Sequence, residues 1–296
     1  MIKLFWNTHN QKKPNSENKK IREKEESDYG WGQYHEKSSD KWIYKILEKI
    51  KYNIIDSVRN LEKDDILIII DSSVEEKNEL YIKLNLICSK IFLFHLGDEF
   101  GFHNLSPIYN NCNYVWRPFC SSKYFNNEKV KCIPIGYKSG VLNKNISNRK
   151  YKWAFTGTPH KSSRHDLLFQ FSNIEPFFCH KTEKFDVKNI SVDEMNDVLS
   201  STEFIPCPYG FFHPETYRVF EALECGCIPI VENAYQYYDR LFPNNPFIKI
   251  DKWKDAKPIL QGWDNDQIKK KSEECSIWWN KQKSDMQDFI KGKINS

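Results

Sequence analysis

The strongest constraint on the fold comes from short, uninterrupted apolar segments that end in polar residues. Residues 65–71 read Asp-Ile-Leu-Ile-Ile-Ile-Asp, and residues 90–95 read Lys-Ile-Phe-Leu-Phe-His. Runs of this length are typical of parallel strands that are buried on both faces of a sheet. Similar segments predict strands at residues 2–6, 114–117, 130–134, 152–156, 177–180, 203–206, 227–231 and 247–250.

Helices are expected between these strands, where apolar residues recur every three or four positions. They are predicted at residues 41–61, 78–86, 191–200, 214–225 and 267–291. Alternating strands and helices indicate an α/β fold with parallel sheets. A chain of 296 residues suffices for two such domains, and the polar residues 138–149 mark the boundary. We therefore expect domains at residues 1–140 and 150–265, followed by a C-terminal helical segment at residues 266–296.

Composition excludes several classes of function. The 44 basic and 40 acidic residues give a net charge of +4 and are mixed along the chain, so no nucleic-acid partner is expected. No apolar run approaches the roughly 20 residues of a membrane span, and the N-terminus does not resemble a signal peptide. The sequence therefore predicts a cytoplasmic protein whose nine cysteines, Cys120 and Cys132 among them, are reduced and mostly buried.

One segment, residues 204–231, has the order of a nucleotide-binding site. A strand is followed by a turn-rich loop, by a helix that would begin at Pro214, and by a second strand after Gly226. In an α/β sheet the free N–H groups at such a helix N-terminus bind anions. Arg218 lies one turn into this helix, where it can bind a diphosphate, and Glu221 can accept hydrogen bonds from ribose hydroxyls. The alternative is that these two side chains form an ordinary surface ion pair.

The motifs in this segment resemble those of GT-B glycosyltransferases, and above all those of the exostosin family. They are Pro208-Tyr-Gly210, Thr216-Tyr-Arg218, Glu221-Ala-Leu223 and Gly226-Cys-Ile-Pro-Ile230. Four further segments resemble the ribitol xylosyltransferase branch of that family, namely residues 95–99, 133–136, 153–158 and 161–164. Many retaining GT-B enzymes carry a glutamate eight positions before the one that Glu221 matches. His213 stands there in this chain, which favours an inverting enzyme.

The resemblance implies a GT-B fold, in which two Rossmann-like domains with parallel sheets face a cleft and a C-terminal helix packs back towards the N-terminal domain. It also implies a UDP-sugar donor, with xylose as the sugar of that branch, and a glycan or polyol-phosphate acceptor. No cofactor and no metal are expected, because Asp264-Asn-Asp266, which has the spacing of a metal-binding motif, is predicted to start a helix. The residues expected to bind the donor are Gly157, Thr158, Lys161, Arg164, Pro208, Gly210, His213, Glu215, Thr216, Arg218 and Glu221.

An inverting transfer needs a general base beside the acceptor hydroxyl. Asp98 and Glu99 follow a predicted buried strand at the edge where ligands bind, and Asp98 is the preferred candidate of the two. His35 and His95 are alternative bases. The residues expected to contact the acceptor are Trp31, Tyr34 and His35. Each of these groups could instead have a structural role. The two acids could cap a helix, and the aromatic and histidine rings could pack in a core.

Three other functions stay open at the level of sequence. A sugar-nucleotide epimerase of the same fold would need no acceptor, and a non-catalytic nucleotide- or sugar-binding protein would release no product. A metal-dependent hydrolase would lose its activity in the presence of a chelator. Release of the nucleotide from a sugar nucleotide, measured with and without acceptors, distinguishes these alternatives from a glycosyltransferase.

Overall fold

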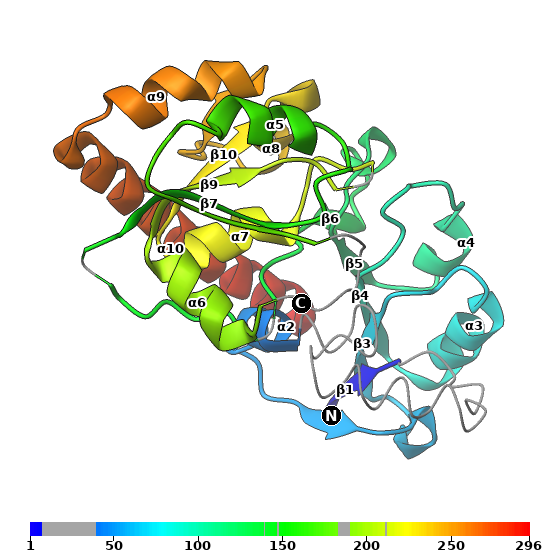
Figure 1. Cartoon of the computed structure of the whole chain (residues 1–296). Helices are drawn as coiled ribbons and strands as arrows, with labels where there is room; N and C mark the ends of the chain where they lie inside the picture. Colours follow the sequence, from blue (N-terminus) through cyan, green and yellow to red (C-terminus); the bar gives the residue numbers. More distant parts are fainter. Residues whose placement is uncertain (8–39, 139, 147, 183–189, 211) are drawn as a thin grey trace, which may run out of the picture. The chain divides into compact units, whose positions relative to one another are not determined.

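The computed structural model describes residues 1–7, 40–138, 140–146, 148–182, 190–210 and 212–296. Within these ranges the chain forms two compact units, one made of residues 1–135 and 285–296 and the other of residues 136–284. Each unit contains one sheet of parallel strands with helices beside it (Figure 1). The predicted α/β fold class with two parallel sheets is therefore confirmed.

The first unit is built on a six-stranded sheet with the strand order β2-β1-β3-β4-β5-β6, and neighbouring strands run parallel. Because β3, β4 and β5 are neighbours, their carboxyl ends lie at one edge of the sheet. The elements of this unit are β1 (Ile2–Trp6), α2 (Asp40–Ile46), β2 (Asn53–Ile55), the short helix η1 (Val58–Asn60), β3 (Ile66–Asp71), α3 (Asn78–Ile87), β4 (Lys90–His95), α4 (Ser106–Tyr109), β5 (Tyr114–Arg117), η2 (Ser122–Tyr124) and β6 (Val130–Cys132).

The second unit is built on a five-stranded parallel sheet with the order β11-β10-β9-β7-β8. This order places β7 beside β9 in the middle of the sheet. The elements are β7 (Tyr151–Gly157), α5 (Arg164–Phe171), β8 (Phe177–Lys181), α6 (Val192–Ser200), β9 (Thr202–Cys207), α7 (Tyr217–Glu224), β10 (Ile228–Glu232), η3 (Ala234–Gln236), α8 (Tyr237–Leu241), β11 (Ile248–Ile250), η4 (Trp253–Ala256), α9 (Lys257–Gly262) and α10 (Asn265–Asn295).

The long helix α10 starts where the sequence predicts a helix start. The side chain of Asp264 accepts a hydrogen bond from the backbone N–H of Gln267 over 2.8 Å, which caps the first turn. The last turns of α10, from Asp285 onward, belong to the first unit. There the side chain of Gln287 donates to the carbonyl of Lys45 over 2.8 Å. None of the helices in the described ranges combines the length and the apolar composition needed to cross a bilayer.

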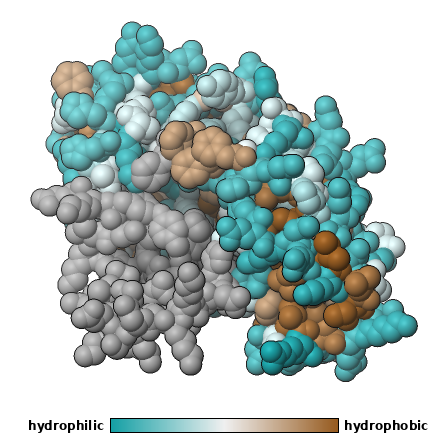
Figure 2. Space-filling view, turned by 90° about the vertical axis from the view of Figure 1, so that its right-hand side faces the viewer, coloured by the Kyte–Doolittle hydropathy of each residue, from teal (hydrophilic) through white to brown (hydrophobic). Residues whose placement is uncertain are grey.

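The predicted strands form because their apolar side chains fill the two cores. Ile68, Ile69 and Ile70 of β3 are all 0% exposed, and in the second sheet Phe204 and Ile228 are equally buried. Burial of each such side chain contributes roughly 1.5–3 kcal/mol. The face turned to the viewer in Figure 2 is correspondingly rich in hydrophilic residues, with apolar side chains gathered mainly at its lower right.

Helix α2 ends at Ile46, so the prediction of one helix over residues 41–61 is wrong. Residues 53–55 instead form the edge strand β2, in which Asn53 pairs with Lys3 of β1. Apolar spacing does not separate the two outcomes, because a short apolar run fits a strand as well as a helix. The hydrogen bonds to β1, which form only in the folded sheet, decide in favour of the strand.

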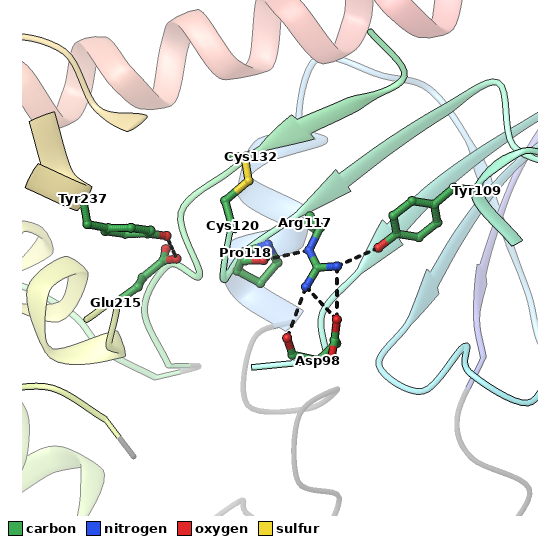
Figure 3. Close-up of a disulfide and its surroundings, with 8 residues drawn as sticks. All are labelled: Asp98, Tyr109, Arg117, Pro118, Cys120, Cys132, Glu215 and Tyr237. Atoms are coloured by element: carbon green, nitrogen blue, oxygen red, sulfur yellow. Dashed lines mark hydrogen bonds and ion pairs between the residues drawn. A yellow bond between two sulfur atoms is a disulfide. The ribbon is translucent and has the colours of Figure 1, made fainter. Parts of the chain in front are cut away.

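Cys120 and Cys132 form a disulfide (Figure 3), which corrects the prediction that all nine cysteines are reduced thiols. Strands β5 and β6 are neighbours, and the loop between them brings the two Cα atoms to 5.7 Å from each other. The remaining seven cysteines are free, and all of them except Cys179 are buried, as expected. The pairing depends on the adjacency of the two strands, which the cysteine spacing alone does not reveal.

Replacing both Cys120 and Cys132 with serine is expected to lower the free energy of unfolding by about 2–3 kcal/mol. The disulfide closes a short loop, with a sequence separation of 12, and thereby limits the conformations of the unfolded chain. Urea denaturation with and without a reductant measures the effect, and the free, half-buried Cys179 provides the control variant Cys179→Ser. A reductant that leaves the wild-type midpoint unchanged would contradict the expectation.

Candidate functional site

The candidate donor site lies at the carboxyl edge of the sheet in the second unit. Strands β7 and β9 are neighbours, so the loops that follow them, residues 158–163 and 208–216, leave from the same edge. The first loop leads into α5, which begins at Arg164, and the second leads into α7, which begins at Tyr217. All residues predicted to bind the donor lie at this strand end, in these two loops or on these two helices.

Two arginine side chains meet beside Gly157, the last residue of β7. A Cβ atom added to this glycine would lie 3.3 Å from Nη2 of Arg218 and 3.7 Å from Nη1 of Arg164. Nη2 of Arg218 donates to the carbonyl of Thr156 over 2.6 Å, and Nη1 of Arg164 donates to the carbonyl of Thr158 over 3.1 Å. Gly157 has a φ of +135°, which residues other than glycine rarely adopt. The glycine thus leaves room for both guanidinium groups.

Within the described residues, no carboxylate neutralises these two guanidinium groups. In the described part of the chain no ion pair joins Arg164 or Arg218 to an acid, so the surface pair of Arg218 with Glu221 is not formed. Arg164 is 9% exposed, and its burial, together with repulsion by Arg218, lowers its pKa to about 9. Such a concentration of positive charge favours an anionic ligand, because the anion would offset the repulsion.

Helix α7 begins at Tyr217, three residues later than predicted, and Thr216 is its N-cap residue. The later start has a tertiary cause, because the carbonyl of Pro214 accepts a hydrogen bond from the hydroxyl of Tyr238 over 2.8 Å. Oγ1 of Thr216 is buried and has no hydrogen-bond partner among the residues that the structure describes. A buried hydroxyl next to the free N–H groups of a helix N-terminus suits an anionic oxygen.

The loop after β7 connects to the loop after β9 through Arg164. Nη2 of Arg164 donates to the carbonyl of Tyr209 over 3.2 Å, and its backbone N–H donates to the carbonyl of Lys161 over 3.1 Å. Thr158 is buried, and its hydroxyl lies 3.2 Å from that of Thr182. These contacts fix the guanidinium of Arg164 at the edge of the sheet.

The loop before α7 is shaped by Glu215 and His213. Glu215 is 1% exposed, and its carboxylate accepts a hydrogen bond of 2.6 Å from the hydroxyl of Tyr237 (Figure 3). Nδ1 of His213 accepts the backbone N–H of Glu215 over 3.1 Å, and its ring meets that of Tyr237 edge-on at 4.7 Å between centroids. The N–H of Gly210 donates to the carbonyl of His213 over 3.1 Å, which closes the turn after the buried Pro208.

The structure therefore brings part of the predicted donor set together. The guanidinium groups of Arg164 and Arg218 both lie beside Gly157. The hydroxyl of Thr216, which has no partner in the described ranges, is at the start of the helix that carries Arg218. Glu221 lies one turn further along α7 and is half-buried. The roles of Glu221 and of the loop residues toward a donor stay predictions.

A second group of polar residues lies at the carboxyl edge of the sheet in the first unit. Asp71, His95 and Arg117 end the neighbouring strands β3, β4 and β5, and all three are 0% exposed. Asp71 accepts hydrogen bonds from the side chains of Lys77 and Tyr81 over 2.7 and 3.1 Å. Burying polar side chains costs free energy unless they are paired, so their concentration at a strand edge marks a candidate functional edge.

Asp98, the preferred candidate base, lies in the loop after β4 and faces Arg117 (Figure 3). Its side chain is 1% exposed, and its Oδ2 lies 3.4 Å from Nη2 of Arg117. Its φ of +61° is left-handed, a conformation that in residues other than glycine is concentrated at functional sites. The neighbouring Glu99 is half-buried. Because α4 begins only at Ser106, neither acid caps a helix.

His95, an alternative base, is enclosed by the protein. Its burial, assisted by the charges of Arg117 and Lys77, lowers the pKa of the imidazole well below its usual range. Nδ1 lies 2.7 Å from the hydroxyl of Tyr109, and Nε2 is buried, 4.0 Å from a carboxylate oxygen of Glu75. The preference for Asp98 therefore rests on its contact with Arg117 and on its left-handed φ rather than on basicity.

Three residues at or beside this edge, Asp71, Tyr109 and Arg117, are absent from the residues predicted to form the site. A signal for Arg117 exists in the sequence, because residues 114–117 read Tyr-Val-Trp-Arg and a charge at the end of an apolar strand must find a partner. Tyr109 gives no comparable signal. The predicted acceptor contacts, which are Trp31, Tyr34 and His35, lie outside the described residues.

Solved structures with a similar fold are glycosyltransferase-like proteins. HepE of Anabaena, crystallised with UDP and glucose, has a TM-score of 0.53 and 9% sequence identity, covering 100% of this chain and 99% of HepE. An α1,3-fucosyltransferase has a TM-score of 0.52 and 13% identity, covering 99% of this chain and 90% of that one. At such identities the likeness concerns the fold, which is GT-B. No curated protein sequence matches this chain.

A comparison with protein-family models identifies the family of this chain as well as its fold. The model of the RXYLT1 C-terminal domain matches residues 137–295, which is more than half of the chain. The matched region contains the second unit almost completely, and with it both arginines beside Gly157. It also contains the motifs that resemble the exostosin family. The chain therefore belongs to the RXYLT1 C-terminal domain family, an exostosin-like family of glycosyltransferases.

Proposed function

We propose that this glycosyltransferase is inverting and moves a sugar from a UDP-sugar to a hydroxyl group of a glycan or a polyol phosphate. The observation that carries the proposal is the pair of guanidinium groups of Arg164 and Arg218 beside Gly157, which lack a carboxylate partner in the described ranges. HepE, which shares the fold, was crystallised with UDP. Membership in the RXYLT1 C-terminal domain family supports xylose as the sugar.

In the proposed reaction the acceptor oxygen forms a bond to the anomeric carbon while the bond from that carbon to the β-phosphate oxygen breaks. UDP leaves with the electron pair of the broken bond, so negative charge grows on the diphosphate. Arg164, Arg218 and the N-terminus of α7 would stabilise this charge. The proton of the acceptor hydroxyl passes to a general base, for which Asp98 is the candidate.

The proposed reaction uses no metal and no cofactor, because two protein cations are available for the leaving group. A chelator should therefore leave the release of UDP unchanged, whereas a metal-dependent hydrolase would lose its activity. A cytoplasmic location also stays a prediction. The seven free cysteines agree with a reducing compartment, in which the one disulfide would be unusual.

UDP at a concentration of 100 times its Kd is expected to raise the melting temperature by about 5–10 °C. Binding to the folded state alone stabilises it by about 2.7 kcal/mol at that concentration, and each kcal/mol shifts the melting temperature of a domain of this size by about 2–4 °C. Thermal denaturation in the presence of UDP measures the shift. Uridine, which lacks the diphosphate, is the matched control and should have a far smaller effect.

Turnover then separates the glycosyltransferase from the remaining alternatives. Release of UDP from UDP-xylose and other UDP-sugars is measured with ribitol 5-phosphate, with oligosaccharides and without an acceptor. A glycosyltransferase releases more UDP when its acceptor is present, and NMR of the product gives the anomeric configuration. The proposal is wrong if UDP does not stabilise the protein, or if the product keeps the anomeric configuration of the donor.

A further inference from the structure

Arg117 forms an extensive set of hydrogen bonds at the carboxyl edge of the first sheet, next to Asp98. It is 0% exposed at the end of β5, and its guanidinium makes five hydrogen bonds (Figure 3). Nε donates to the carbonyl of Pro118 over 3.2 Å, and Nη1 donates to the hydroxyl of Tyr109 over 3.0 Å. The other three contacts all go to Asp98.

The contacts with Asp98 are unequal between its two carboxylate oxygens. Nη1 and Nη2 of Arg117 lie 3.5 and 3.4 Å from Oδ2, and Nη2 also donates to the backbone carbonyl of Asp98 over 3.2 Å. Oδ1 is buried and has no hydrogen-bond partner among the described residues. A buried acceptor without a partner is rare in native proteins and needs a cause. Arg117 thus fixes one oxygen of this carboxylate, whereas the other is buried without a partner in the described ranges.

Other side chains fix the position of the Arg117 guanidinium. The hydroxyl of Tyr109, which accepts from Arg117, lies 2.7 Å from Nδ1 of His95 at the end of β4. Burial raises the pKa of Tyr109, so the hydroxyl keeps its proton. The ring of Tyr124 lies under the guanidinium, 4.6 Å from Cζ. Contacts on several sides hold Arg117 in one orientation, which is the condition for holding Asp98 precisely.

We infer that Arg117 is a positioning residue, which fixes Asp98 so that the unpaired Oδ1 takes the proton of the acceptor hydroxyl. This inference rests on the proposed function. It accounts for the left-handed φ of Asp98, because the backbone carbonyl and Oδ2 of that residue both turn toward one guanidinium. A lysine at position 117 keeps the charge but lacks the planar fork, so it would not make these contacts together.

The test compares Arg117→Lys and Arg117→Ala with the wild type, using the UDP-sugar and acceptor that give the fastest release of UDP. In Arg117→Lys kcat is expected to fall by about 100-fold, the scale of a small misplacement of a reacting group. The KM for the UDP-sugar should change less than about twofold, since the donor residues are unaltered. Millimolar guanidinium chloride should restore part of the kcat of Arg117→Ala.

Arg149→Lys is the matched control, because Arg149 is a partly buried arginine that donates to the backbone carbonyls of Thr202, Cys225 and Gly226 and belongs to neither candidate site. Its kcat should stay close to that of the wild type. Because Arg117 and the predicted donor residues belong to different units, a wild-type circular dichroism spectrum and a cooperative thermal transition, rather than UDP binding, show that the Arg117 variants are folded. If Arg117→Lys has the kcat of the wild type, the inference is wrong but the proposed function is unaffected. The same holds if its lower kcat/KM comes entirely from a higher KM for the UDP-sugar. Absence of UDP release in the wild type would overturn the proposed function as well.

Discussion

Replacement of Arg218 with alanine is expected to weaken the binding of UDP by at least about 30-fold, which corresponds to about 2 kcal/mol. The guanidinium of Arg218 lies beside Gly157 at the end of β7, together with that of Arg164, and has no carboxylate partner in the described ranges. A diphosphate bound there would lose one of its two strongest partners. Isothermal titration calorimetry with UDP measures the loss.

The stability of the Arg218→Ala variant should change little, which distinguishes this prediction from a general loss of structure. Arg218 repels the buried Arg164, so its removal relieves a destabilising interaction while the hydrogen bond to Thr156 is lost. Arg240→Ala removes an exposed arginine from another helix of the same unit and should leave UDP binding intact. Wild-type affinity for UDP in Arg218→Ala would refute the assignment of this edge as the donor site.

Replacement of Asp98 with asparagine is expected to lower kcat by about 100- to 10,000-fold, the usual contribution of a general base. The amide has nearly the shape of the carboxylate but does not take up the proton of the acceptor hydroxyl. The Kd of UDP should stay unchanged, because the predicted donor residues all belong to the second unit and Asp98 to the first. Steady-state release of UDP and calorimetry together provide both quantities.

The neighbouring acid provides the comparison for Asp98→Asn. Glu99 is half-buried in the same loop, and Glu99→Gln should lower kcat less than about tenfold if Asp98 is the base. A large loss in Glu99→Gln together with a small loss in Asp98→Asn would transfer the role of base to Glu99. If neither variant loses activity, general base catalysis from this loop is excluded.

The location of the donor arginines could be predicted from the sequence because local order determines it. A strand, a loop and a helix follow one another directly at Arg164 and again at Arg218, and neighbouring parallel strands place such helix starts at one edge. The start of α7 was harder to predict. Its shift from Pro214 to Tyr217 depends on Tyr238, which is distant in the sequence from the helix that it delays.

The sequence by itself determined the two parallel sheets, their strands and the family, because continuous apolar runs and short motifs are local properties of the chain. Only the tertiary structure decided that residues 53–55 form an edge strand, that Cys120 bonds to Cys132, and that Arg117 pairs with Asp98. Each of these three outcomes joins elements that are separate along the chain. Their free energy comes from hydrogen bonds, a covalent bond and a buried charge pair that exist only once neighbouring strands have been brought together.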